Sequence, residues 1–65
     1  MNIIVNGEAR QARSTTLAEL LVELGYDSAW IATAVNGEVV AGDRRAATTL
    51  AEGDRIEILA PRQGG

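Results

Sequence analysis

The tetrapeptide Val-Asn-Gly-Glu occurs twice in this chain, at residues 5–8 and again at residues 35–38. Asn-Gly favours the two-residue type I′ turn of a β-hairpin, because both central residues of that turn need a positive φ angle. Apolar residues precede each copy, so the sequence predicts one hairpin from strands 3–5 and 8–11 and another from strands 31–35 and 38–40. We interpret the repeat as shared turn chemistry and not as an internal duplication, because the surrounding residues do not match.

A helix is predicted between the two hairpins. Thr16 and Glu19 have the spacing of a capping box at its start, and Gly25 is placed to end it in a left-handed conformation. We expect Glu19 and Glu23 to point into water. The apolar face is formed by four leucines at positions i, i+3, i+4 and i+7: Leu17, Leu20, Leu21 and Leu24.

The remaining residues predict a loop at 42–45, with Arg44 and Arg45 in solvent, a helical turn at 46–50 and a last strand at 55–60. In that strand Ile56 and Ile58 alternate with outward residues that include Leu59. Pro61 would end the strand.

This element order predicts an α+β domain in which one main helix packs on one face of a mixed four- to five-stranded sheet. By analogy, it is the order of the ubiquitin-like β-grasp fold. We expect a β-grasp domain at 1–60 and a flexible tail at 61–65. The core must be aliphatic, with Tyr26 and Trp30 at its rim.

Composition argues against a catalytic centre within this chain. It has no cysteine and no histidine, so the commonest metal ligands and general bases are missing. No hydroxyl has a histidine or lysine to activate it. We therefore expect a protein that is not an enzyme, with no catalytic residue, metal site or bound cofactor.

Charge and hydropathy also narrow the choice of partner. The net charge is −3 and the six basic residues, all arginines, are scattered along the chain. A nucleic-acid surface needs clustered basic residues, so nucleic acid is not expected as a partner. No apolar run is long enough to span a bilayer, and the N-terminus does not have the pattern of a signal peptide. These features predict a cytoplasmic protein that does not bind membranes.

Gly64-Gly65 is the segment with the clearest chemical meaning. We expect Gly65 to be the natural end of the chain, projecting from the edge of the sheet after Pro61. A terminal carboxylate that is to be adenylated must enter a narrow active site on another protein. Glycine suits that task because it has no side chain to clash and tolerates unusual backbone conformations.

Taken together, these features resemble the ThiS-type sulfur carriers of thiamin biosynthesis. One difference is visible at residues 41–44, Ala-Gly-Asp-Arg, where family members often have a Pro-Arg pair. The similar stretches cover nearly the whole chain: residues 1–8, 17–24, 34–40, 50–58 and 61–65.

The resemblance implies that an adenylating (E1-like) enzyme uses ATP and magnesium to activate the Gly65 carboxylate. Sulfur from a persulfide donor would then produce a thiocarboxylate, which a thiazole synthase would consume. The modified end would be Gly64 and Gly65. The expected docking residues lie beside it: Leu59, Pro61, Arg62 and Gln63.

Other functions remain open from the sequence. The small subunit of molybdopterin synthase, or a carrier for another sulfur-transfer pathway, would share this chemistry. A ubiquitin-like protein modifier would use the same activated carboxylate to form isopeptide bonds. A β-grasp binding module, for instance one associated with RNA, would make no use of the tail.

Overall fold

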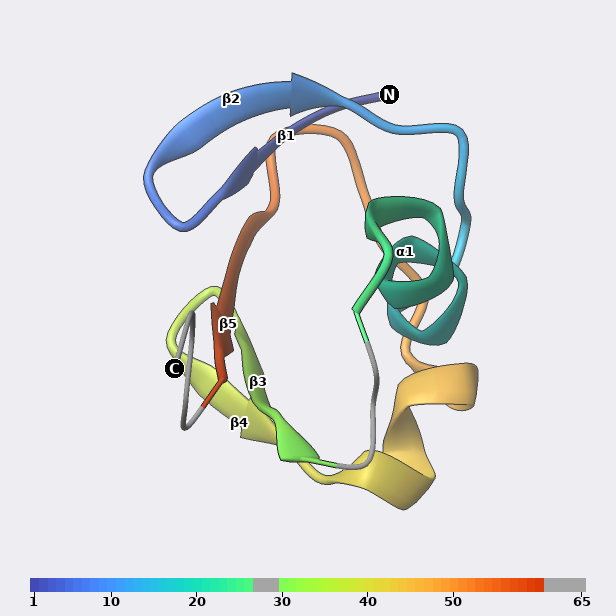
Figure 1. Ribbon diagram of the computed structural model, residues 1–65. Helices are drawn as coiled ribbons and strands as arrows, with labels where there is room; N and C mark the ends of the chain where they lie inside the picture. The colour runs from blue at the N-terminus through green and yellow to red at the C-terminus, as the bar shows by residue number, and fades with distance from the viewer. Residues whose placement is uncertain (27–29, 61–65) are drawn as a thin grey trace.

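The protein is described by a computed structural model that covers residues 1–26 and 30–60, shown as a ribbon in Figure 1. A five-stranded sheet has the spatial order β2-β1-β5-β3-β4. The neighbours β1 and β5 run parallel and the other neighbouring pairs run antiparallel, so the sheet is mixed. The strands are β1 (Asn2–Val5), β2 (Glu8–Gln11), β3 (Ala32–Val35), β4 (Glu38–Val40) and β5 (Arg55–Leu59).

Both predicted hairpins are confirmed. Asn6 and Asn36 each have a φ of 51°, and the glycines that follow them have φ values of 84° and 86°. A two-residue turn with two positive φ angles is the type I′ turn that matches the twist of the adjoining strands. These turns set the register of each hairpin, with Val5 opposite Glu8 and Val35 opposite Glu38.

Helix α1 (Leu17–Leu24) begins and ends where the sequence predicts. Thr16 and Glu19 form the full capping box, and Gly25 ends the helix with a φ of 83°. The helix lies on one side of the curved sheet in Figure 1. Three of its leucines are buried against apolar residues of the sheet and of the loops, in one core: Ile3, Val5, Ala12, Leu17, Leu20, Leu21, Leu50, Ile56 and Ile58.

The two helix glutamates were expected only to point into water, and that expectation is incomplete. The carboxylate of Glu23 accepts hydrogen bonds from the backbone N–H groups of Arg13 and Ser14, at 3.2 Å each, and from the Ser14 hydroxyl. Glu19 accepts from the backbone and hydroxyl of Thr15 at 2.9 Å each. Each set lowers the pKa of its carboxyl, because the bonds stabilise the charged form.

The expected loop at 42–45 and helical turn at 46–50 are wrong in their boundaries, because one 3₁₀ helix, η2 (Gly42–Ala47), occupies most of that segment. Arg45 is only 6% exposed, so it does not lie in solvent as expected. Its Nε donates to the Thr33 hydroxyl at 3.0 Å and its Nη2 donates to the Ile31 carbonyl at 2.9 Å. From η2 the guanidinium thus reaches one polar group on β3 and one just before it.

The two aromatic residues differ in their environment. Tyr26 is half-buried against the core, as a rim residue should be. Trp30 is 76% exposed and lies just before β3, so the prediction that it belongs to the rim of the core is wrong. The core is filled by aliphatic side chains from the sheet and α1, and Trp30 is absent from it.

Candidate functional site

Strand β5 is the element that leads directly toward the C-terminal residues. It lies in the middle of the sheet, paired with β1 on one side and β3 on the other. Ile56 and Ile58 point into the core at 1% and 3% exposure, while Leu59 is 71% exposed. The predicted alternation is therefore confirmed, and Leu59 is presented to solvent from a strand that is paired along both edges.

Leu59 belongs to a group of apolar residues on the sheet face opposite α1. Ala32 lies directly across from Leu59 in the β3–β5 register, and Ala34 lies across from Val39 in the β3–β4 register. Directly paired residues share one face of a sheet. We call these four residues the open-face patch: Ala32, Ala34, Val39 and Leu59.

The open-face patch is accessible, since Val39 is 84% exposed and Ala32 is also exposed. Within residues 1–26 and 30–60, α1 packs on the other face of the sheet. Glu57 lies across from Ala34 on the same face, and Arg55 lies across from Ile4. The surface is thus an apolar area with a carboxylate and a guanidinium beside it, a composition typical of protein-binding surfaces.

The sequence analysis predicted that one member of this patch, Leu59, is a docking residue. It missed Val39, although the signal was present. A two-residue turn places Val35 opposite Glu38, so Ala34 must face Val39, and alternation along the strand puts Ala34 on the face opposite the buried Thr33. Exposed Trp30, two residues before Ala32 in the sequence, was likewise not recognised as a surface residue.

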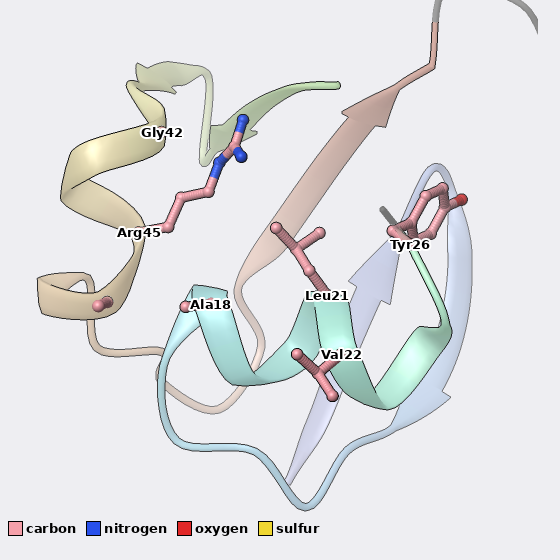
Figure 2. A pocket seen from close by; sticks show the side chains of 7 residues that line it. Ala18, Leu21, Val22, Tyr26, Gly42 and Arg45 are labelled. Atoms are coloured by element: carbon pink, nitrogen blue, oxygen red, sulfur yellow. The ribbon is translucent and has the colours of Figure 1, made fainter. Parts of the chain in front are cut away.

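A different hollow lies on the other side of the molecule, between α1 and η2. Its volume is about 220 Å³. Figure 2 shows Val22 and Ala18 on the helix and the Arg45 side chain reaching across from η2. Val22 is 79% exposed, so this side also presents an apolar side chain. Because the guanidinium of Arg45 is engaged by β3, we regard this hollow as a packing feature and not as a ligand site.

The remaining predicted site residues, Pro61, Arg62, Gln63, Gly64 and Gly65, lie outside the described residues. In the described part of the chain, no group of three or more acidic, histidine or cysteine side chains is arranged to hold a metal ion. No helix among residues 1–26 and 30–60 has both the length and the apolar character needed to cross a bilayer.

Comparison with known sequences gives consistent relatives. The model of the ThiS family matches residues 3–65. The sulfur carrier protein ThiS of Thermus thermophilus is 36% identical over 61 residues, which are 94% of this chain and 95% of that protein. A thiazole synthase of Paramagnetospirillum magneticum is 39% identical over 66 residues and matches all of this chain. The chain spans about a fifth of that protein, 20% of its length.

Comparison with solved structures supports the fold. The crystal structure of the thiamine biosynthesis protein ThiS from Geobacter metallireducens superposes with a TM-score of 0.83 at 33% identity, and the match covers 100% of both chains. The solution structure of a thiamine biosynthesis protein from the same organism gives a TM-score of 0.82 at 32% identity. That match covers all of this chain and 88% of the other. The predicted ubiquitin-like β-grasp fold is therefore confirmed.

Proposed function

The chain belongs to the ThiS family and acts as a sulfur carrier in thiamin biosynthesis, and we propose that it carries the sulfur as a thiocarboxylate on Gly65. The observation that carries this proposal is the full-length match to a sulfur carrier, which extends on the family model to Gly65 itself. The proposal requires Gly65 to be the last residue of the mature chain. An intact mass measurement checks that requirement directly.

The proposed chemistry has two stages. A Gly65 carboxylate oxygen attacks the α-phosphorus of ATP, with magnesium balancing the phosphate charge, and pyrophosphate leaves. The terminal sulfur of a persulfide then attacks the acyl carbon of the adenylate and AMP leaves. A thiol reduces the resulting acyl disulfide and releases the thiocarboxylate. An adenylating enzyme and a persulfide donor supply these steps, so this chain is their substrate and not a catalyst.

The contribution of this chain is to present its end from a fixed position. Strand β5 is held by β3 as far as Leu59 and, on its other side, by β1 and then the Asn6 side chain as far as Ile58. The last two glycines suit a narrow active site because they have no side chains. We propose that Pro61, Arg62 and Gln63 contact the walls of the partner's channel on the way to its reactive atoms.

The open-face patch is the proposed docking surface for the adenylating enzyme. Leu59 is 71% exposed and Val39 is 84% exposed, and both lie on the face that α1 leaves uncovered. Exposed apolar groups on one face are a common feature of protein-binding surfaces, because their burial on association is favourable. Leu59 is only two residues from Pro61, so contact here would bring the tail close to the bound enzyme.

A thiazole synthase is the proposed acceptor of the sulfur. The support is the Paramagnetospirillum protein, which carries that name and contains a stretch similar to this whole chain. A carrier joined to the enzyme that it serves would have its reactive end at a high effective concentration near the acceptor site. We propose that this chain meets its thiazole synthase in the cytoplasm, where ATP for the preceding adenylation is available.

The deciding experiment is an intact mass measurement before and after incubation with ATP, magnesium, a sulfide source and an adenylating enzyme. Cleavage after Arg62 then releases the fragment Gln63-Gly64-Gly65. The fragment matters because oxidation of Met1 or Trp30 adds nearly the same mass as replacing oxygen by sulfur. A gain confined to the fragment is expected, and a variant without Gly65 should show none.

No gain in the fragment, with an enzyme proven active on another carrier, would overturn the proposal. A conjugate of higher mass, joined through Gly65 to a lysine of another protein, would favour a protein modifier instead. Both outcomes are visible in the same spectra, so the experiment separates the two uses of an activated carboxylate.

A further inference from the structure

The side chain of Asn6 extends the pairing of β5 beyond the end of β1. Along this edge the backbone N–H groups of Ile4 and Asn6 donate to the carbonyls of Asp54 and Ile56, each at 2.9 Å. The next carbonyl on the same side of β5 belongs to Ile58. It accepts from Asn6 Nδ2 at 3.1 Å, and the Ile58 N–H donates to Asn6 Oδ1 at 2.8 Å.

A carboxamide has the same donor and acceptor groups as a peptide unit, so Asn6 replaces the strand residue that is missing there. The chain turns away at Asn6 and Gly7 to form the first hairpin, and both have positive φ angles. Without the carboxamide, the N–H and C=O groups of Ile58 would lose these partners in a partly buried place, which is unfavourable. Asn6 therefore pairs the last part of β5 on its β1 side.

The second copy of the tetrapeptide holds the opposite end of the same strand. The backbone N–H of Asn36 donates to the Arg55 carbonyl at 2.7 Å, and the Arg55 N–H donates to Asn36 Oδ1 at 2.9 Å. Asn36 Nδ2 also donates to the Asp54 carboxylate at 3.0 Å. The repeat is thus more than shared turn chemistry, because its two asparagines bond the start and the end of β5 from opposite sides.

We propose that Asn6 is a positioning residue for sulfur transfer, which rests on the proposed function of Gly65. By holding Ile58 in the sheet, it keeps Leu59 on the open face and fixes the direction in which the following residues leave β5. Asn36 holds the strand too, but at Arg55, far from the tail. The two asparagines should therefore contribute similarly to folding and differently to the reaction.

The test compares the variants Asn6→Gly and Asn36→Gly. Each converts Asn-Gly to Gly-Gly, which allows the positive φ angle of the turn and removes the side chain with its carboxamide, at the same backbone cost in both variants. Both should lower the urea midpoint of unfolding to a similar extent. The two substitutions are matched in chemistry, turn type and strand, so a difference between them reports on the position of the bond.

Amide hydrogen exchange measures how well the hydrogen bonds of each asparagine protect the backbone amides of β5. Asn6→Gly should raise the exchange rate of the Ile58 N–H roughly 5- to 10-fold more than that of the Arg55 N–H, because only Ile58 loses its hydrogen-bond acceptor. Asn36→Gly should raise the exchange rate of the Arg55 N–H more than that of the Ile58 N–H. Unchanged exchange at Ile58 in Asn6→Gly would overturn the proposal.

The second readout is kcat/KM for the carrier in pyrophosphate release by the adenylating enzyme, at a temperature where both variants are fully folded. Asn6→Gly should reduce it roughly 3- to 10-fold, while Asn36→Gly should stay within about twofold of the native chain. Equal losses in both variants, or no loss in Asn6→Gly, would overturn the positioning role.

Failure of the proposed function can be distinguished from failure of the positioning role of Asn6. If the native chain is not adenylated by an enzyme proven on another carrier, the proposed function is overturned and the positioning role with it. Hydrogen exchange needs no partner enzyme, so it still establishes whether Asn6 holds the end of β5. Loss of activity in Asn6→Gly alone, with an active native chain, supports the positioning role.

Discussion

Arg45 on η2 and Thr33 on β3 are joined by a buried hydrogen bond of 3.0 Å from Nε to the hydroxyl, and that hydroxyl donates in turn to the Val40 carbonyl at 2.8 Å. Nη2 of Arg45 also donates to the Ile31 carbonyl. Arg45→Ala removes the bonds that Arg45 donates, and it leaves the Thr33 hydroxyl and the Ile31 carbonyl with fewer partners. It should lower the free energy of unfolding by about 2–3 kcal/mol, measured by urea denaturation.

Arg44→Ala is the matched control for that prediction. Arg44 is the neighbouring arginine on η2 and its side chain is exposed, so its removal should change the free energy of unfolding by less than about 0.5 kcal/mol. In a double-mutant cycle, Thr33→Val should cost less in the Arg45→Ala background than in the native chain. Equal losses for Arg44→Ala and Arg45→Ala would contradict the structural role of Arg45.

The apolar face of α1 gives a second prediction, on stability. Leu20 is fully buried at 0% exposure, and Val22, two residues later on the same helix, is 79% exposed. Leu20→Asp would bury an unpaired charge in the core and should leave the chain unfolded at 25 °C. Val22→Asp, the same charge at a solvent position, should keep the native circular dichroism spectrum. A folded Leu20→Asp variant would show that the core is packed differently.

Local patterns allowed most of the secondary structure to be predicted. The Asn-Gly turns, the four-leucine face with its capping box and the alternation of β5 each depend on residues close together in sequence. Turn type also implied the register of both hairpins. The spatial order of the five strands was not predicted beyond a mixed sheet, because the parallel pairing of β1 with β5 joins residues some fifty positions apart.

The features that were missed depend on tertiary contacts. Nothing near Arg45 in the sequence indicates burial, since its bonding partners lie 12 and 14 residues away on and beside β3. Glu23 likewise bonds a loop nine and ten residues earlier. Trp30 was expected at the rim of the core, but the aliphatic residues already fill this small core and Trp30 is left 76% exposed. Leu59 is the predicted site residue that lies within residues 1–26 and 30–60, and its predicted exposure is confirmed.

The bonds made by Glu23 predict that stability depends on pH in acid. The Ser14 hydroxyl and the backbone N–H groups of Arg13 and Ser14 hold the pKa of Glu23 below its ordinary value of 4.5. The carboxylate therefore stabilises the fold fully above about pH 4.5, and this contribution is lost as the pH falls through the lower, folded-state pKa. Urea midpoints measured from pH 7 to pH 2.5 should decline in that acidic window.

Two matched variants separate the stabilising effect of the Glu23 hydrogen bonds from a general loss of negative charge: Glu23→Gln and Glu57→Gln. Glu57 lies on the open face, and its carboxylate makes no hydrogen bond within residues 1–26 and 30–60. Both variants remove one acidic group. Glu23→Gln should flatten the decline in acid and lower the midpoint at pH 7, while Glu57→Gln should leave the shape of the curve unchanged. Identical curves for the two variants would show that the Glu23 bonds do not stabilise the fold.

The open-face patch gives the last prediction, on partner binding. Leu59→Thr keeps a side chain that suits a strand and removes apolar surface that is 71% exposed in the free chain. Since that surface is already in water, the free energy of unfolding should change by less than about 0.5 kcal/mol. The KM of the adenylating enzyme for this carrier should rise roughly tenfold, as expected when a large apolar contact is lost from an interface.

Val22→Thr is the control for that loss of apolar surface, because Val22 is 79% exposed and lies on α1, the element that packs on the opposite face of the sheet. If the enzyme docks on the open face, Val22→Thr should keep the native KM in the same pyrophosphate-release assay. A native KM for Leu59→Thr, or an equal rise for Val22→Thr, would place the docking surface elsewhere. Because the tail is unchanged in both variants, kcat at saturating carrier should stay close to that of the native chain.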